Sequence, residues 1–281
     1  MKVAVTGASG FIGRHVVAEL ARHDLELVLA TRNPGRLGQV PVPGTRVVEL
    51  DIGVSAGDTL ARLGYPDVLI HLAWGGLPNY LSATHLDVEL PRQYRFLEGL
   101  IGAGLKSLIV TGTCAEYGMQ YGPLAEHLAT APVSAYGQAK DALRRQLALL
   151  QEAESFALTW IRLFFMHGEG QPSSSLLPQL EAAVRRGDRV FNMSGGEQLR
   201  DYLPVSEVAR QIVALALTGQ GLGIVNVCDG KPTSVRRLIE NEIAVRGWDI
   251  RLNLGHYPYI DYEPMAFWGD RRRLDAILAH S

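Results

Sequence analysis

The chain has 281 residues, of which 47% are hydrophobic and 20% are charged. This composition suits a globular protein with a large core. The formal net charge of −2 excludes the concentrated basic surface expected of a nucleic-acid-binding protein. The two cysteines, Cys114 and Cys228, have no metal-ligand spacing, so we expect neither a disulfide scaffold nor a metal site.

Hydropathy predicts a cytoplasmic protein with no membrane partner. No apolar run approaches the roughly 20 residues that a membrane helix needs. Met1 and Lys2 lead directly into the apolar run Val3-Ala4-Val5, which indicates a buried strand instead of a signal peptide.

Short β-branched segments alternate with helical patterns in the first two-thirds of the chain. This alternation is typical of a parallel sheet with helices on both faces. The predicted strands are Lys2–Thr6, Leu25–Thr31, Arg46–Glu49, Val68–Leu72, Ser107–Thr111 and Leu158–Leu163. The predicted helices, from the spacing of apolar residues, are Phe11–Arg22, Leu86–Ala103 and Ala135–Ala153.

The pattern becomes irregular after Phe165. A Gly/Ser/Pro loop precedes predicted helices at Leu176–Arg186 and Ser206–Leu217, with predicted strands at Val190–Met193 and Ile224–Cys228. We therefore expect an α/β protein with a Rossmann-like doubly wound parallel sheet in residues 1–166, to which about 201–228 returns. We expect residues 167–281 to form mainly a smaller, discontinuous lobe that binds the substrate.

A glycine-rich loop lies between the first predicted strand and the first predicted helix. Glycines at this place let the chain turn sharply and let its backbone approach a pyrophosphate at the helix N-terminus. The sequence thus predicts a nicotinamide dinucleotide bound by Gly7, Ser9, Gly10, Phe11, Ile12 and Gly13.

The end of the second predicted strand favours NADP over NAD. Thr31, Arg32 and Arg36 stand where NAD-binding proteins carry a carboxylate, and a guanidinium can pair with a 2′-phosphate. Alternatively, the two arginines cap an exposed loop.

Residues that follow the third and fourth predicted strands complete the expected cofactor site. Asp51 and Ile52 would meet the adenine amino group, or form a strand-end turn. Leu72, Ala73 and Trp74 would lie beside the nicotinamide ribose, although such apolar residues more often belong to a core.

Tyr136 and Lys140 lie one helical turn apart on one face. An ammonium favours the phenolate and so brings the tyrosine pKa toward neutrality. Thr113, after the fifth strand, is the candidate to hydrogen-bond a substrate oxygen. Glu116 is either a substrate contact or a structural group, and Cys114 either a buried filler or a nucleophile.

Taken together, these motifs resemble the extended short-chain dehydrogenases/reductases, in the NAD-dependent epimerase/dehydratase family acting on nucleotide sugars. The motifs that carry the resemblance, over residues 1 to about 205, are Thr6–Gly13, His71-Leu72-Ala73, Thr113 before Tyr117-Gly118, Tyr136 with Lys140, and Arg200-Asp201-Tyr202.

The resemblance implies a role for each matched residue. Tyr136 is the acid/base, Lys140 binds the nicotinamide ribose, and Thr113 orients the sugar. Arg200 and Asn192 would contact the sugar nucleotide and Leu163 the cofactor. A homodimer is also implied, through the two long predicted helices.

Two departures from the family pattern narrow the function. Cys114 and Ala115 stand where 4,6-dehydratases carry acids, and the stretch 87–90 lacks a common asparagine. The first hypothesis is NAD(P)H-dependent reduction of the 4-keto group of a dTDP- or GDP-linked 4-keto-6-deoxyhexose, for surface polysaccharide or deoxysugar biosynthesis. The alternatives are a 4-epimerase with tightly bound NAD and a non-catalytic dinucleotide sensor.

Overall fold

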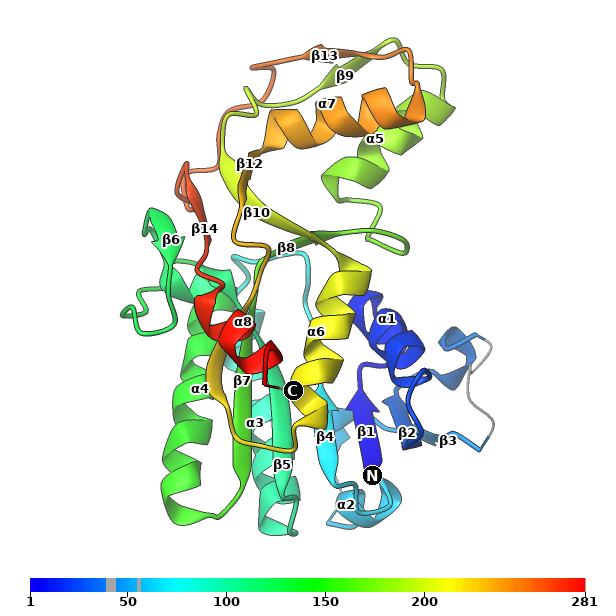
Figure 1. The fold of residues 1–281 in the computed structure, drawn as a ribbon, viewed down its shortest axis with the longest axis vertical. Helices are drawn as coiled ribbons and strands as arrows, with labels where there is room; N and C mark the ends of the chain where they lie inside the picture. Colours follow the sequence, from blue (N-terminus) through cyan, green and yellow to red (C-terminus); the bar gives the residue numbers. More distant parts are fainter. Residues whose placement is uncertain (39–43, 55–56, 281) are drawn as a thin grey trace.

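The computed structural model describes residues 1–38, 44–54 and 57–280. A wide α/β layer carries a smaller lobe, with β1 and β4 in the layer and α5, α7, β9 and β13 at the far end of the lobe (Figure 1). Within the described residues, no helix has both the length and the apolar character needed to cross a bilayer.

One all-parallel sheet organises the larger layer and confirms the predicted doubly wound architecture. Among the described residues it has seven strands, in the order β11-β7-β5-β4-β1-β2-β3. The strands are β1 (Lys2–Thr6), β2 (Glu26–Thr31), β3 (Arg46–Glu49), β4 (Val68–His71), β5 (Ser107–Thr113), β7 (Ala157–Leu163) and β11 (Gly223–Val227). The strand order reverses between β1 and β4, where such sheets open a ligand crevice at their carboxyl ends.

Helices bury both faces of this sheet. One face packs against α1 (Phe11–Leu20), α6 (Val205–Leu217) and α8 (Arg272–Leu278), and the other against α2 (Thr59–Arg62), α3 (Leu90–Gly102) and α4 (Ala135–Ala153). Side chains of β1 alternate between the two cores, with Val3 and Val5 in the first and Ala4 in the second. Both faces are therefore dry, which fixes the strand ends that form the crevice.

The lobe has a smaller core of its own. Its helices are α5 (Leu176–Arg185) and α7 (Val235–Arg246), and its strands are β8 (Phe165–His167), β9 (Val190–Asn192), β10 (Leu199–Pro204), β12 (Pro232–Ser234) and β13 (Arg251–Asn253). Leu180, Phe191, Ile239 and Ile250 are buried between them. β6 (Gly122–Leu124) and β14 (Phe267–Gly269) pair beside the large sheet.

The long helix predicted from residue 86 begins differently. Residues His85–Glu89 form a π-helix before α3 starts at Leu90. Pro91 has no N–H to donate to the preceding turn, which interrupts the regular ladder here. The wider turn leaves the side chain of Glu89 buried, at 5% exposure, and such π-helical turns are frequent at functional sites.

Candidate active site

A cavity of ≈ 450 Å³ opens at the carboxyl ends of β1, β2 and β4. Most residues predicted to bind the cofactor line it. The lining residues are Thr6, Gly7, Ser9, Gly10, Ala30, Thr31, Arg32, Asn33, Arg36, Leu50, Asp51, Ile52, Leu72, Ala73, Trp74, Gly75, Glu89 and Arg92. The predicted residues that are not among them are Phe11, Ile12, Gly13, Tyr136, Lys140 and Leu163.

The loop after β1 makes a backbone cradle in this cavity. Gly7 has φ +71°, and a Cβ there would meet the Ala73 nitrogen at 2.8 Å, so a side chain is excluded on two grounds. Gly10 begins α1 with no side-chain hydrogen bond to its first turn. The free N–H groups of that turn are therefore available to an anion. The cradle fits the pyrophosphate of a dinucleotide.

The far end of the cavity carries positive charge and no carboxylate at the end of β2. Thr31 Oγ1 hydrogen-bonds to Ser9 Oγ at 2.8 Å, while Arg32 and Arg36 are exposed. Asp51 Oδ1 accepts from Gly53 N at 2.8 Å, which holds its carboxylate at the start of a 3₁₀ turn. These residues fit either nicotinamide dinucleotide.

Tyr136 and Lys140 lie on the first turns of α4. Ser134 Oγ caps that helix by accepting from Gly137 N at 3.1 Å. Lys140 Nζ donates to Thr111 O at 2.7 Å and lies 3.9 Å from the centroid of the Trp74 ring. The Tyr136 ring packs edge-on against Trp74, with 5.9 Å between centroids. Since Trp74 also lines the cavity, it joins the Tyr–Lys pair to the dinucleotide crevice.

Burial dominates the acidity of this pair. It raises the pKa of the Tyr136 phenol above its ordinary value, while a hydrogen bond with Thr113 lowers it. Burial lowers the pKa of Lys140 to about 7, against the opposing charges of Glu116 and Glu89. The direction of the Tyr136 shift is opposite to the one expected from an ammonium neighbour, because desolvation of the phenol is its largest cause. Tyr136 carries its proton here.

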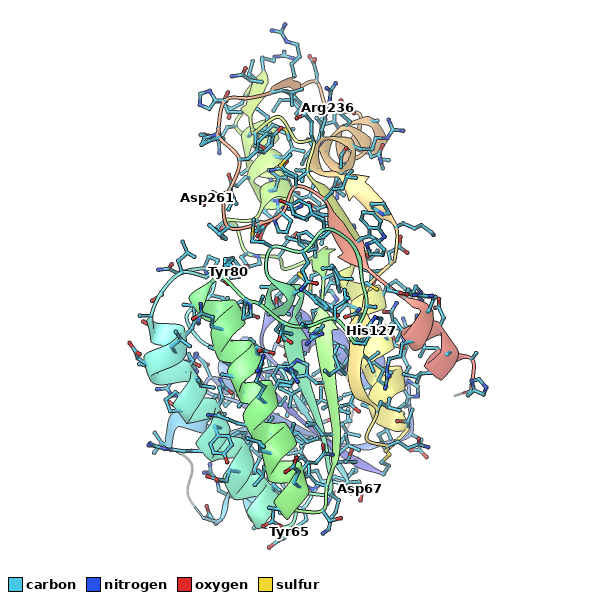
Figure 2. The ribbon with its side chains drawn as sticks, turned by 90° about the vertical axis from the view of Figure 1, so that its left-hand side faces the viewer. Tyr65, Asp67, Tyr80, His127, Arg236 and Asp261 are labelled. Atoms are coloured by element: carbon cyan, nitrogen blue, oxygen red, sulfur yellow. The ribbon has the colours of Figure 1, made fainter. Side chains whose placement is uncertain are left out.

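A ring of aromatic side chains closes around Tyr136. Tyr80 and His85 lie at centroid distances of 5.5 and 5.3 Å, and Tyr136 N donates to Tyr80 O at 3.0 Å. Tyr80 lies at the rim of the α/β layer below Asp261 of the lobe (Figure 2). The catalytic end thus faces the lobe.

Thr113 ends β5 and Glu116 anchors the turn that follows. Glu116 is 0% exposed. Its Oε1 accepts from Thr113 N at 2.8 Å and its Oε2 from Arg162 Nε at 2.7 Å, with Trp160 Nε1 bonded to both oxygens. This geometry favours the structural alternative for Glu116, because no oxygen is left to face a substrate.

Cys114 follows Thr113 but is a poor nucleophile. Burial and the nearby charge of Glu263 raise the pKa of its thiol to about 12. Because only the thiolate is reactive, this direction favours the filler alternative.

Arg200 is already engaged within the chain. It is 4% exposed, and its Nη2 donates to Glu263 Oε2 at 2.9 Å while its Nη1 donates to Leu199 O at 2.9 Å. Asn192, by contrast, lies on β9 at the outer end of the lobe (Figure 1), where its Oδ1 accepts from Asn253. The structure does not bring Asn192 to the catalytic residues.

Comparison with known proteins agrees with this site. The model of the NAD dependent epimerase/dehydratase family matches residues 3–228. The chain belongs to this family. Its members are NAD(P)-dependent oxidoreductases and epimerases, so this protein is an enzyme of that class, of the extended short-chain dehydrogenase/reductase type.

Individual relatives of the enzyme divide between two reactions. It is 29% identical, over 96% of its length and 99% of the relative, to a dTDP-6-deoxy-L-talose 4-dehydrogenase (NAD(+)) of Aggregatibacter actinomycetemcomitans. It is 26% identical to a UDP-glucose 4-epimerase of Corynebacterium glutamicum, over 89% of this chain and 82% of that protein. The solved structure of MoeE5 with UDP-glucuronic acid and NAD is 26% identical, with a TM-score of 0.83 over 99% of this chain and 93% of that one.

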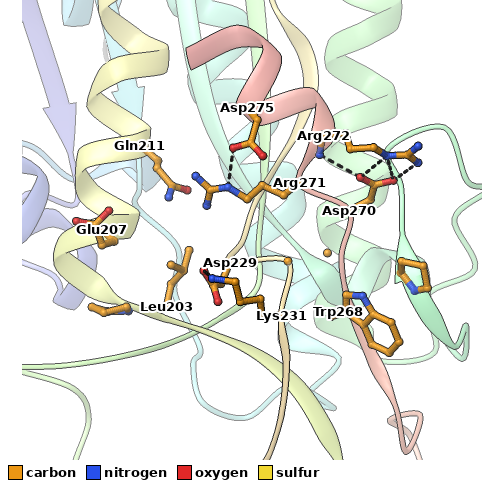
Figure 3. A pocket seen from close by; sticks show the side chains of 14 residues that line it. Leu203, Glu207, Gln211, Asp229, Lys231, Trp268, Asp270, Arg271, Arg272 and Asp275 are labelled. Carbon is orange, nitrogen blue, oxygen red and sulfur yellow. Dashed lines mark hydrogen bonds and ion pairs between the residues drawn. The ribbon is translucent and has the colours of Figure 1, made fainter. Parts of the chain in front are cut away.

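A second cavity of ≈ 900 Å³ lies away from this site, between α6, β10 and α8 (Figure 3). Four of its charged residues form ion pairs with one another, Arg271 with Asp275 and Arg272 with Asp270. None of the predicted site residues lines it. Most residues predicted to bind the cofactor line the smaller cavity instead.

Sequence reasoning missed three polar residues at the crevice: Glu89, Arg92 and Gln93. Glu89 and Arg92 line the cavity, and Gln93 is 0% exposed behind them. The one signal in the sequence was that residues 87–90 lack the asparagine common in the family. The π-helix that turns Glu89 inward was not foreseeable from periodicity.

Proposed function

We propose that this enzyme reduces the 4-keto group of a dTDP- or GDP-linked 4-keto-6-deoxyhexose, with NADPH as the preferred reductant. The carrying observation is the packing of the Tyr136 ring and the Lys140 ammonium against Trp74, a wall of the cavity with the glycine cradle. A reductase needs its acid protonated before hydride transfer, and burial keeps this phenol in that state. The similarity to the 4-dehydrogenase, whose reaction is the reverse, also supports the proposal.

The chain's residues divide the chemistry among them. The cradle at Gly7, Ser9 and Gly10 would hold the dinucleotide pyrophosphate. NAD(P)H, when bound, supplies the hydride. Thr113 would hydrogen-bond the carbonyl oxygen of the sugar and Tyr136 would donate its proton to that oxygen as the C–O π electrons move onto it. The Lys140 ammonium would then stabilise the Tyr136 phenolate until solvent returns the proton.

A spectrophotometric panel tests the proposal. Purified enzyme is mixed with NADPH and either dTDP- or GDP-4-keto-6-deoxyhexose, and absorbance of the reduced cofactor is followed. Loss of absorbance with at least one sugar is the expected result. Cofactor that co-purifies in stoichiometric amount, together with C4 inversion and no net redox turnover, would instead establish the 4-epimerase alternative that the similarity to the UDP-glucose 4-epimerase raises.

The preference for NADPH rests on Arg32 and Arg36, which line the cavity next to Thr31 with no carboxylate at that strand end. A 2′-phosphate there would gain two charge-assisted partners. Calorimetric titration with NADPH and NADH tests it, and tighter binding of NADH would overturn it.

We further propose a homodimer through α3 and α4. These helices pack on each other over one face of the sheet, and α4 exposes Leu149 to 63%. Light scattering coupled to gel filtration should give twice the chain mass of 30.7 kDa, and a monomer would refute the interface.

A further inference from the structure

A continuous chain of buried hydrogen bonds runs behind the cofactor cavity. Thr6 Oγ1 bonds to His71 Nδ1 at 2.8 Å and His71 Nε2 to Gln93 Oε1 at 2.6 Å. Gln93 Nε2 then donates to Glu89 Oε2 at 3.1 Å. Each of the four side chains is at most 5% exposed.

The polarity of this chain follows from its last member. Glu89 accepts from Gly75 N at 3.0 Å and from Arg92 Nη1 at 3.3 Å, in addition to Gln93. A group that accepts three times and donates to none is a carboxylate.

The Gln93 amide must then donate to Glu89 and accept, through Oε1, from His71 Nε2. Burial lowers the pKa of His71 to about 4, so the ring is neutral and Nδ1 has to accept from the Thr6 hydroxyl. The hydrogen bonds therefore all point the same way, from Thr6 to Glu89, and the negatively charged acceptor, Glu89, lies at the cavity.

That charge lies close to the lysine of the catalytic pair. Glu89 Oε2 accepts a hydrogen bond from Gly75 N. The residue before Gly75 is Trp74, and the Lys140 ammonium lies over the Trp74 ring. Burial lowers the pKa of Lys140, while the charge of Glu116 from the turn after β5 and, less strongly, that of Glu89 from the π-helix raise it. His71 from β4 and Tyr136 from α4 itself also face the ammonium. Of the two acids, Glu116 is already paired with Arg162 at 2.7 Å.

We propose that Glu89 is a positioning residue whose buried negative charge holds Lys140 in its ammonium form at the cofactor crevice. The partner of Glu89, Arg92, is 32% exposed and is screened by solvent, so it cancels the charge only in part. The inference deepens the proposed function, since it supplies the charge that Lys140 brings to Tyr136. It concerns the protonation of Lys140 alone, and its test needs no substrate.

The substitution Glu89→Gln removes the charge and, with it, the ion pair to Arg92. Its carbonyl oxygen can take the place of Oε2 and accept from Gly75 N and Gln93 Nε2, while its amide faces the partly exposed Arg92 guanidinium. The chain contains only four lysines, at positions 2, 106, 140 and 231. A ¹³Cε-lysine NMR titration of the cofactor-free protein therefore resolves each ammonium, and Lys140→Arg assigns the signal.

We expect the Lys140 midpoint to fall by about one pH unit or more in Glu89→Gln, as removal of a nearby opposite charge requires. Glu89→Asp keeps the charge and should retain a midpoint nearer that of the wild type. Glu98→Gln makes the same change at an exposed position of α3 and should leave the midpoint unmoved. An unchanged midpoint in folded Glu89→Gln overturns the proposal, whether or not the enzyme reduces any sugar.

A measurement on the wild type covers the case in which Glu89→Gln does not fold. The hydrogen-bond polarity requires the His71 ring to carry its proton on Nε2, which ¹⁵N shifts of the ring distinguish from the Nδ1 form. The Nε2–H form supports the charged chain. The Nδ1–H form would reverse its polarity and remove the carboxylate on which the proposal rests.

Discussion

Two buried ion pairs of the enzyme differ in how firmly they are held. In the α/β layer, the side chains of Glu116 and Arg162 are 0% and 1% exposed, and every Glu116 oxygen is bonded. In the lobe, Arg200 is equally buried, but its partner Glu263 is 32% exposed and uses one oxygen on it. The first pair fixes the Thr113 turn, whereas the carboxylate of the second pair is partly exposed to solvent.

The two ion pairs lie in parts of the enzyme that are held together differently. Thr113 ends strand β5 of the large sheet, and Tyr136 and Lys140 lie on α4, which packs against one face of that sheet. Glu263 comes from a segment outside helices and strands, within electrostatic reach of Cys114 and Tyr80. On the proposed function, the α/β layer would carry the chemistry, and the lobe would contact the sugar.

The largest expected effect is in the α/β layer, for Tyr136→Phe. Loss of the proton donor should lower kcat by about 10²- to 10⁴-fold, with little change in NADPH affinity, because the dinucleotide cradle is elsewhere. Tyr80→Phe is the matched control, since it removes a hydroxyl from the adjacent ring at the cleft rim. Equal losses in both variants would contradict the assignment of the proton to Tyr136.

The next effect is on stability, in Glu116→Gln. The change leaves the Arg162 guanidinium buried without its counter-charge, which should cost about 3–5 kcal/mol. Urea unfolding measures it, with Glu263→Gln in the same series. If Glu116→Gln destabilised the protein no more than Glu263→Gln, the two ion pairs would be equally important for stability, which would contradict the account.

Much of this architecture was foreseeable. The strands and long helices could be predicted from the spacing of apolar residues, because helices cover both faces of the sheet. The role of Gly7 could be predicted because a sharp turn at a pyrophosphate requires glycine. The ion pairs of Glu116 and Arg200 could not be predicted from the sequence, because their partners Arg162 and Glu263 are 46 and 63 residues away. The direction of the Tyr136 pKa shift was predicted from Lys140 alone. Burial, which depends on the whole fold, shifts that pKa in the opposite direction.

Cofactor selection gives a smaller effect. Arg32→Ala should weaken NADPH binding by about tenfold, corresponding to ~1.4 kcal/mol for one lost charge-assisted contact, and leave NADH binding nearly unchanged. Calorimetry with both cofactors reports the ratio. A parallel loss for both would show that Arg32 only shapes an exposed loop.

The smallest stability effect belongs to the lobe. Glu263→Gln keeps the shape of the side chain at a partly solvated pair, so the free energy of unfolding should change by about 1 kcal/mol or less. The KM for the nucleotide sugar should rise while NADPH affinity stays the same. A change in kcat with constant KM would instead assign Glu263 to the chemistry of the α/β layer.

The central claim is that hydride reaches the sugar carbon next to the oxygen that Tyr136 protonates. Single-turnover reaction with NADPH deuterated at the transferable position, followed by mass spectrometry of the product, tests it most directly. We predict one deuterium at C4 of the reduced sugar for each cofactor oxidised, and formation of this product about 10²- to 10⁴-fold more slowly with Tyr136→Phe. A product without deuterium, or an epimerised sugar with the cofactor still reduced, would contradict the account.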